Sequence, residues 1–225
     1  MTKKKNIDKT AAGKRVGKIF PILKKTYPDA CTMLDHCDPF QLLIATILSA
    51  QCTDVRVNMV TKDLFAKYRS VNDFDAADAE QIEADIRSTG FYRNKAANIK
   101  KTCRILIENF DGKVPDTMEQ LCTLAGVGRK TANVLLGNCF GTPGIVCDTH
   151  VIRLSRRLGI SENKDPVKLE YDLMEIVPKY DGGGWTIFSH LLIFHGRAVC
   201  KARKPNCHDC PIMAHCPSAN KQELW

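Results

Sequence analysis

Four cysteines near the C-terminus constrain the fold of this chain more than any other feature. The spacing C-x6-C-x2-C-x5-C places four thiolate ligands within residues 200–216, namely Cys200, Cys207, Cys210 and Cys216. A zinc ribbon usually has two C-x2-C pairs separated by a longer loop. Here one such pair is flanked by single cysteines, a compact spacing that favours a 4Fe-4S cluster and leaves zinc as the alternative.

The other cysteines and the composition indicate an intracellular protein. Eleven cysteines in a chain without a signal-peptide pattern point to metal binding rather than disulfides. We expect four of the scattered cysteines to be small core residues: Cys31, Cys103, Cys122 and Cys139. With 225 residues and 44% apolar composition, the chain is long enough for one large domain or two small ones, and no apolar run reaches the roughly 18 residues of a membrane span.

Charge is distributed unevenly along the chain. Residues 1–25 hold nine lysines and arginines against Asp8 alone, which accounts for the whole formal charge of +8. Acidic residues are also absent from residues 86–107 and 182–208, and both segments are basic. Such segregation suits a polyanion such as nucleic acid, although ordinary surface charge is the alternative. We expect the first helix near Lys14, which leaves residues 1–13 as a basic arm.

Apolar spacing predicts an all-α protein. Helical periodicity recurs along most of the sequence, as in the segment that follows Pro39 and in residues 96–110, and no segment keeps the alternation of a strand. Asp165-Pro166 predicts a helix start, and Gly182–Gly184 predicts a break before a last helix over residues 185–199. Capping boxes are expected at two places, Asp78 with Gln81 and Asp116 with Glu119.

The segment LAGVGRKTANV, residues 124–134, predicts a helical hairpin. A short helix capped at Asp116 runs to about Leu124, the turn is Gly126-Val127-Gly128, and a second helix starts at about Arg129. Both glycines allow positive φ and close approach of another backbone, while Val127 anchors the turn in the core. The turn amides and the new helix N-terminus form an anion site suited to a DNA phosphate, which favours a DNA-binding hairpin over an ordinary corner.

Two residues near this hairpin are candidates for chemistry. Lys130 lies in the first turn of the second helix, where the helix N-terminus and partial burial disfavour the ammonium form and suit an amine nucleophile. Pairing with a phosphate is the alternative role. Asp148, in VCDTHV, precedes another helix and is placed to cap it. A carboxylate fixed by capping can also stabilise positive charge that develops on a sugar ring.

These motifs together resemble the endonuclease III family of helix-hairpin-helix DNA glycosylases. The match rests on LAGVGRKTANV, VCDTHV and the cysteine spacing, in that order, with support from LLIATILSAQCTDVRVN, STGFYRNKAANI and HGRAVC. It covers about residues 14–217. The resemblance implies an all-α fold in two lobes: a six-helix barrel over residues 32–142, with the hairpin at about 116–140, and a cluster lobe built from residues 1–31 and 143–225.

The resemblance also implies a reaction and its residues. Lys130 attacks C1′ of a damaged nucleotide and forms a Schiff base, β-elimination cuts the strand 3′ to the lesion, and Asp148 assists from a shared cleft. The family extrudes the target base; Gln51 matches the residue that fills the space, and Phe91, often Leu in the family, matches the wedge. The other implied DNA contacts are Gly126, Val127, Gly128, Arg129, Lys201, Arg203 and Lys204.

The resemblance further implies a monomer that acts on double-stranded DNA with oxidised or saturated pyrimidines or abasic sites, in the bacterial cytoplasm and associated with the nucleoid. Two alternatives remain at this point. The related adenine-mismatch glycosylases typically have Ser where this chain has Lys130 and a Glu in a segment that here, over residues 42–49, has none. The chain could also be a non-catalytic DNA-binding protein that uses its cluster as a structural or redox element.

Overall fold

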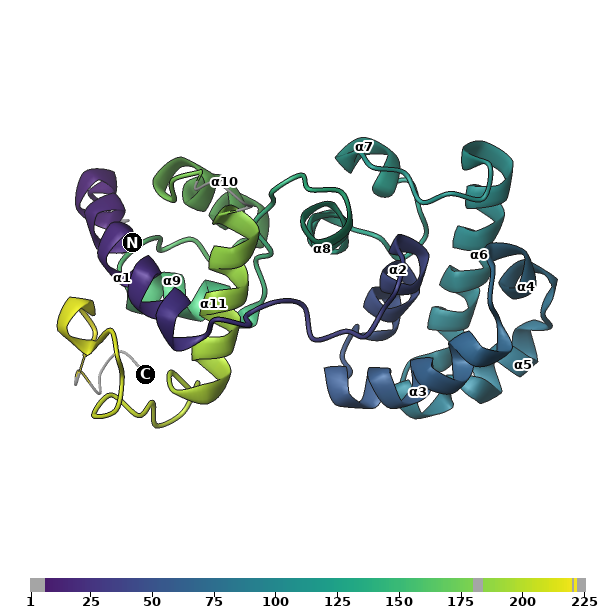
Figure 1. Cartoon of the computed structure of the whole chain (residues 1–225), viewed down its shortest axis with the longest axis horizontal. Coiled ribbons are helices and arrows are strands. Elements are labelled where there is room, and N and C mark those ends of the chain that lie inside the picture. Colours follow the sequence, from purple (N-terminus) through teal and green to yellow (C-terminus); the bar gives the residue numbers. More distant parts are fainter. Residues whose placement is uncertain (1–6, 180–183, 220, 222–225) are drawn as a thin grey trace, which may run out of the picture. The chain divides into compact units, whose positions relative to one another are not determined.

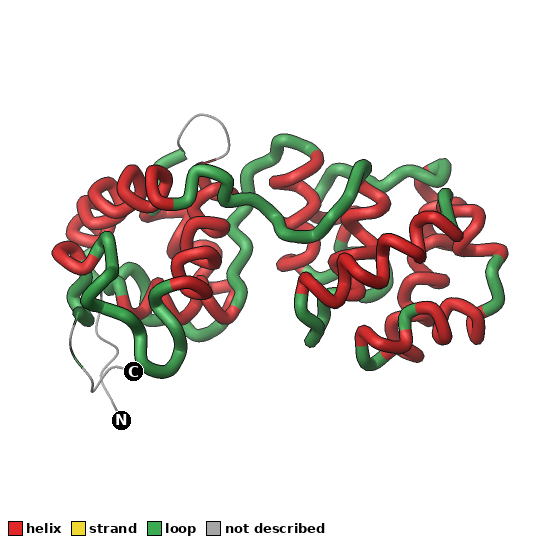
Figure 2. Tube along the Cα trace, turned by 60° about the horizontal axis from the view of Figure 1, so that its bottom comes forward, coloured by secondary structure: helices red, strands yellow, loops and turns green. Residues whose placement is uncertain are grey.

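The computed structural model describes residues 7–179, 184–219 and 221. Helices and loops make up all of these residues, and no strand occurs among them (Figure 2). The predicted all-α class is therefore confirmed. The chain forms two compact units, residues 1–31 with 142–225 and residues 32–141 (Figure 1). Within the described chain, no helix has the length and apolar character that crossing a membrane requires.

The unit of residues 32–141 consists of six α helices of six or more residues, a four-residue helix and a short 3-10 helix. They are α2 (Pro39–Leu48), α3 (Asp54–Lys67), α4 (Val71–Ala76), α5 (Ala79–Asp85), η1 (Arg87–Thr89), α6 (Tyr92–Phe110), α7 (Met118–Leu121) and α8 (Arg129–Cys139). Helix α2 is buried on nearly every side and packs against α3, α6 and α8. Helix α6 begins four residues earlier than expected and ends at Phe110, where its C-cap Asp111, the expected end, adopts a left-handed conformation.

Side-chain caps explain where most of these helices begin. The Asp38 carboxylate accepts a hydrogen bond from the Gln41 amide at the start of α2, and Ser70 forms a reciprocal capping box with Asp73 in α4. The two boxes predicted from the sequence are wrong. Asp78 precedes α5 but makes no capping bond. Helix α7 is capped one residue later than Asp116, by Thr117, whose hydroxyl accepts from the Gln120 amide.

The other unit contains α1 (Lys9–Thr26), α9 (Thr149–Arg157), α10 (Pro166–Ile176), α11 (Gly184–Ala198) and η2 (Met213–His215). Helix α11 is its most buried element and packs against both α1 and α9. It begins one residue before the expected Trp185, while Gly182 and Gly183 of the predicted break lie outside the described residues. Asp165 caps α10 with Pro166 in the first turn, as predicted.

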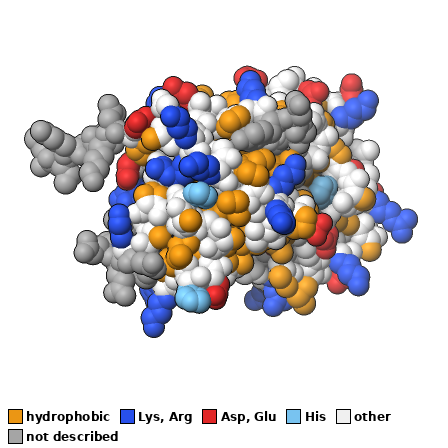
Figure 3. Space-filling view, turned by 60° about the vertical axis from the view of Figure 1, so that its left-hand side comes forward, with side chains coloured by type: hydrophobic (Ala, Val, Ile, Leu, Met, Phe, Trp, Pro, Cys, Tyr) orange, Lys and Arg blue, Asp and Glu red, His pale blue; other side chains and the backbone are white. Residues whose placement is uncertain are grey.

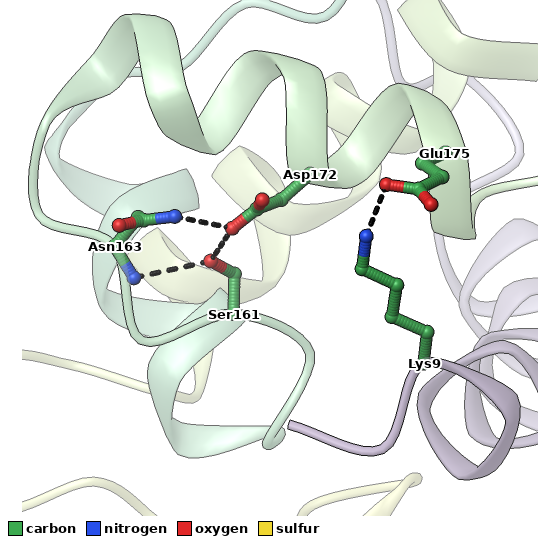
Figure 4. Close-up of polar contacts among 5 residues, drawn as sticks. All are labelled: Lys9, Ser161, Asn163, Asp172 and Glu175. Carbon is green, nitrogen blue, oxygen red and sulfur yellow. Dashed lines mark hydrogen bonds and ion pairs between the residues drawn. The ribbon is translucent and has the colours of Figure 1, made fainter. Parts of the chain in front are cut away.

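Helix α1 begins at Lys9, not near Lys14, so the prediction of a free basic arm over residues 1–13 is wrong for its second half. The Asp8 carboxylate caps the helix by accepting hydrogen bonds from the Thr10 and Ala11 amides at 2.9 and 3.1 Å. Lys9 forms an ion pair with Glu175 of α10 (Figure 4). Ala12 is fully buried, which explains why helix formation extends this far towards the N-terminus.

The loop between α9 and α10 is fixed by a small polar cluster (Figure 4). The Asp172 carboxylate accepts hydrogen bonds from the Ser161 hydroxyl and the Asn163 side-chain amide, both at 2.5 Å. The Asn163 backbone N–H in turn donates to the Ser161 oxygen at 3.1 Å. These contacts fix the loop that follows α9 against α10.

The predicted core cysteines have mixed outcomes. Cys103 is fully buried in α6, and burial raises the pKa of its thiol to about 12. Cys139 is half-buried. Cys31 and Cys122 are exposed, so the prediction is wrong for them. Both lie in turns outside helices, where the apolar periodicity that identifies core positions does not operate.

Candidate active site and metal centre

The loop between α7 and α8 is a tight hairpin that is anchored to α6. Gly126 has φ +76°, which favours glycine, and a Cβ at this position would lie 2.9 Å from the Asn98 side-chain nitrogen and displace that side chain. Val127 is buried, as expected, and its N–H donates to the Leu124 carbonyl. The Thr102 hydroxyl donates to the Ala125 carbonyl at 2.9 Å, which ties the turn to α6.

Gly128 does not use the positive φ that both glycines of the turn allow. Its φ is −103°, a value that any residue adopts, and a Cβ there would meet nothing within 4 Å. The N-cap of α8, Gly128, has no side chain that could cap the helix. Absence of a side chain at Gly128 therefore leaves the N-terminal end of α8 accessible, as an approaching phosphate requires.

Lys130 is the second residue of α8, and its side chain is exposed. The expectation that Lys130 is partly buried is therefore wrong. The buried residue of this turn is Val127, not Lys130. An exposed amine at this open helix end is directly available to a DNA strand.

Asp148 is the N-cap of α9, as its sequence context predicted. Its Oδ1 accepts a hydrogen bond from the Val151 N–H at 2.8 Å, and the residue is half-buried. The preceding residues are fixed against α11, since the Val146 N–H donates to the Ser189 hydroxyl at 3.0 Å. The Asp148 carboxylate is thus fixed by one contact that follows it in the chain, at Val151, and by one that precedes it, at Val146. Asp148 and Lys130 belong to different units, and the expectation that they share one cleft stays a prediction.

Gln51 and Phe91 share an uncommon backbone conformation. Both are non-glycine residues with positive φ, 53° for Gln51 and 48° for Phe91, and both are exposed. The left-handed conformation costs an L-residue roughly 1–2 kcal/mol and persists only where the surroundings impose it. Phe91 is 61% exposed, so it is not a core aromatic. In the described chain, the other non-glycine residues with positive φ are Asp111 and Lys204, and Lys204 is itself a predicted DNA contact.

All four clustered cysteines line one pocket. Its walls also include apolar side chains such as Leu154, Leu158 and Ile212. The pKa of the Cys210 thiol is raised to about 11, mainly by burial; a backbone hydrogen bond from Ile212 lowers it, and the charges of the other three cysteines contribute to the rise. Four thiolates this close repel one another unless positive charge lies between them, so this donor set fits a cationic metal group. In the described residues, no three His, Cys, Asp or Glu side chains are arranged to hold a single metal ion.

Two arginines of α9, which the sequence did not single out, hold the cysteine-containing loop. The buried Arg157 guanidinium lies 3.3 Å from the Cys200 sulfur and donates to the carbonyls of Lys201 and Ala202 at 2.7 and 2.9 Å. Arg153 donates to the Cys200 carbonyl at 3.0 Å. Their i, i+4 spacing places both on one face of the helix that Asp148 caps. The same short helix therefore orients Asp148 and the first cysteine.

His195 contacts the pocket from α11. Its Nε2 lies 3.5 Å from the Cys210 sulfur, and its Nδ1 lies 3.0 Å from the Tyr27 hydroxyl. Burial lowers the pKa of His195 to about 4, so the ring is neutral near pH 7. In the tautomer whose Nδ1 accepts from the Tyr27 hydroxyl, the Nε2 proton points at the Cys210 sulfur, an arrangement typical of residues that orient metal ligands. His208 is exposed and His215 half-buried.

The basic residues after Cys200 lie on the surface. Lys201, Arg203 and Lys204 are all exposed, on a loop whose backbone Arg157 holds. On the face shown in Figure 3, basic side chains are scattered among apolar and acidic ones and do not gather into one patch. Charge alone therefore does not locate a nucleic-acid site on that face. A basic residue is instead assigned to DNA contact by its position in the fold.

We expect the purified protein to be brown and to contain about four iron and four acid-labile sulfide ions per chain, as a cubane with four cysteine ligands requires. Metal analysis together with a sulfide assay checks both values. One tightly bound zinc ion per chain, in protein produced with ample iron, would contradict this expectation. Serine in place of Cys207 is expected to lower the iron content, whereas serine in place of the exposed Cys122 is a control that keeps it.

Comparison with known proteins agrees with this site. Residues 44–179 match the model of the HhH-GPD superfamily base excision DNA repair proteins, and residues 200–216 match the iron–sulfur binding domain of endonuclease III. Endonuclease III of Synechocystis sp. is 54% identical over 206 residues, which cover 91% of this chain and 93% of the relative.

Two solved structures are also similar. A non-covalent endonuclease III–DNA complex has a TM-score of 0.88 and 46% identity, with 95% of this chain and 99% of the other covered. A trapped endonuclease III–DNA covalent intermediate has the same TM-score and identity, over 94% and 98% of the chains. The match over residues 200–216 runs from the first clustered cysteine to the last, and the chain carries a 4Fe-4S cluster. This chain belongs to the HhH-GPD superfamily of base excision DNA repair proteins and, within it, to the endonuclease III family.

Proposed function

We propose that this protein removes oxidised or saturated pyrimidines from double-stranded DNA and then cuts the strand 3′ to the abasic site. The chain is a DNA glycosylase and abasic-site lyase of base excision repair. The observation that carries the proposal is the hairpin, which presents the Lys130 amine beside an uncapped helix N-terminus. The structural similarity to a trapped endonuclease III–DNA covalent intermediate supports a covalent mechanism.

Lys130 is the proposed nucleophile. Its unprotonated amine attacks C1′ of the damaged nucleotide, a bond to nitrogen forms, and the glycosidic bond breaks as the base leaves. Opening of the sugar ring gives a Schiff base between C1′ and Lys130. Loss of the C2′ proton to a base then expels the 3′ phosphate in a β-elimination. Hydrolysis of the Schiff base regenerates the amine.

Asp148 is the proposed electrostatic partner in base release. Positive charge develops on the sugar as the glycosidic bond breaks, and a fixed carboxylate stabilises it more than a mobile one. The cap bond to the Val151 N–H occupies Oδ1 and holds the carboxylate in place. Capping and catalysis are therefore compatible roles for this residue.

The remaining residues are assigned to DNA binding and to the cluster. We assign Cys200, Cys207, Cys210 and Cys216 as cluster ligands, which fold the loop that carries Lys201, Arg203 and Lys204 for contact with phosphates. The hairpin residues Gly126, Val127, Gly128 and Arg129 bind the strand backbone. Gln51 fills the space of the extruded base and Phe91 enters the opposite strand; their exposure and imposed conformation support these roles.

The two units contribute different parts of the proposed function. Residues 32–141 form the barrel that carries the hairpin, and residues 1–31 with 142–225 form the cluster unit. The protein acts as a monomer on damaged DNA. We infer a cytoplasmic protein that DNA binding associates with the nucleoid, and its similarity to bacterial relatives supports the cytoplasmic part of this inference.

A panel of duplexes that differ at one nucleotide tests the substrate class. We expect release of thymine glycol and a cut 3′ to both the thymine glycol and the abasic position, with adenine in a mispair left intact. The matched undamaged duplex is the control, and product lengths with and without later alkali treatment separate base release from strand cutting. Release of mispaired adenine without release of damaged pyrimidine would contradict the proposal and favour the adenine-mismatch branch.

A further inference from the structure

Lys95, in the first turns of α6, is a buried lysine without an acidic partner. Its side chain is 4% exposed, and its Nζ donates to the carbonyls of Leu48 and Thr89 at 2.8 and 2.9 Å. In the described residues, no carboxylate lies within ion-pair distance of this amine. Burial lowers the pKa of Lys95 and outweighs the opposing charge effect of Cys52. A buried ammonium bonded only to backbone carbonyls is costly, so its position needs an explanation.

Both carbonyls lie at helix ends. Leu48 is the last residue of α2 and Thr89 is the last residue of η1. Terminal carbonyls lack partners inside their own helix, and a cation near them is favourable. The backbone N–H of Lys95 also donates to the Phe91 carbonyl at 3.1 Å. One residue is thus bonded to three backbone positions in two separate segments.

These two segments lead directly to the residues proposed to enter the DNA duplex. Gln51 follows Leu48 by three residues, and Phe91 follows Thr89 by two. Both have left-handed backbones, which persist only where neighbouring atoms hold them. We propose that Lys95 is a positioning residue, whose buried amine joins the two loops and thereby fixes Gln51 and Phe91 relative to each other. This inference rests on the proposed DNA-inserting roles of these two residues.

Lys100 supplies a matched control on the same helix. Its Nζ also donates to two backbone carbonyls, those of Asp75 in the last turn of α4 and of Ala77, the C-cap of that helix. The residue is half-buried, and the segment it holds contains no residue that we assign to DNA binding. Replacement of Lys100 therefore removes the same type of contact from α6 and leaves the Gln51 and Phe91 loops intact.

The experiment compares Lys95→Met with Lys100→Met in binding to a duplex with a stable abasic analogue and to the intact duplex. We expect Lys95→Met to lower the preference for the abasic analogue by about tenfold or more, because small misplacements of inserting groups have large effects. Affinity for intact DNA should change little, since phosphate contacts lie elsewhere. Lys100→Met should keep the wild-type preference.

A double-mutant cycle gives the sharper test. In a Phe91→Ala background, Lys95→Met should reduce the preference by much less than in the wild type, because the residue that it positions is already gone. Full additivity of the two effects would contradict the inference, as would an equal loss of preference in Lys95→Met and Lys100→Met. If Lys95→Met does not fold, Lys95→Gln takes its place, and an unchanged preference in this folded variant would overturn the inference.

Gln51→Ala and Phe91→Ala separate failure of this inference from failure of the proposed function. If these two variants lose the preference and Lys95→Met keeps it, the positioning role alone is wrong. If Gln51→Ala and Phe91→Ala both keep the wild-type preference, their proposed roles are wrong and the inference about Lys95 fails with them. Loss of preference in Gln51→Ala, Phe91→Ala and Lys95→Met, but not in Lys100→Met, supports the inference.

Discussion

Replacement of Lys130 by alanine should abolish covalent trapping by borohydride on an abasic duplex, while the wild type is trapped efficiently. Borohydride reduces the Schiff base between an amine and C1′, so a chain without the nucleophilic amine leaves nothing to reduce. Binding of the variant to abasic DNA should persist, because the hairpin amides and the open end of α8 do not depend on this side chain. Gel electrophoresis under denaturing conditions, beside a binding assay, measures both effects.

Two further variants distinguish a nucleophilic role of Lys130 from a role as a positive charge alone. Lys130→Arg keeps a positive charge beside the phosphates, and we expect it to bind like the wild type and still to give no trapped species. Lys101→Ala removes an exposed lysine from α6 of the same unit and should be trapped normally. Normal trapping of Lys130→Ala would mean that another amine is the nucleophile.

Replacement of Asp148 by asparagine should slow base release by roughly 10²-fold or more, the scale of electrostatic and general acid–base contributions. Asparagine keeps the oxygen that accepts the Val151 N–H, and it is as good a helix cap as aspartate. Folding and lesion binding should therefore stay close to those of the wild type. Single-turnover release of thymine glycol at saturating enzyme isolates the chemical step from binding.

Asp165→Asn is the matched control for this change. Asp165 caps α10 in the same unit through an equivalent bond, in which the Lys168 N–H donates to its Oδ1 at 2.9 Å. The two variants lose the same charge at the same type of cap, so any shared effect reports on helix stability alone. An Asp148→Asn variant that unfolds at lower temperature but keeps its turnover would leave Asp148 with the capping role only.

The helical fold was predictable because its signals are local. Apolar residues at helical spacing and capping residues such as Asp38 and Asp165 act within one or two turns of the chain. The start of α1 was missed because the cap at Asp8 lies among lysines that suggest an extended basic arm. The burial of Ala12 and the ion pair from Lys9 to Glu175, which support this start, come from segments distant in sequence.

The candidate site was predictable to a different degree for each residue. Motif spacing identified the four cysteines and placed Asp148 at its cap, since both depend on short sequence separations. The exposure of Lys130 depends on which side of the hairpin faces the core, which spacing alone does not determine. The sequence did not predict the roles of Arg153, Arg157 and Lys95. Their partners include backbone carbonyls, which have no sequence signal. The i, i+4 spacing of the two arginines after Asp148 was a sequence signal that could have indicated their shared role.

The most direct test of this account is to locate the covalent bond itself. The wild-type protein is reduced with borohydride on an abasic duplex and on a thymine glycol duplex, digested with protease and nuclease, and analysed by peptide mass spectrometry. We expect the sugar remnant on the peptide that contains Lys130, with both duplexes. A remnant on any other lysine or on the N-terminal amine, or base release without a covalent adduct, would contradict the central claim that Lys130 is the nucleophile.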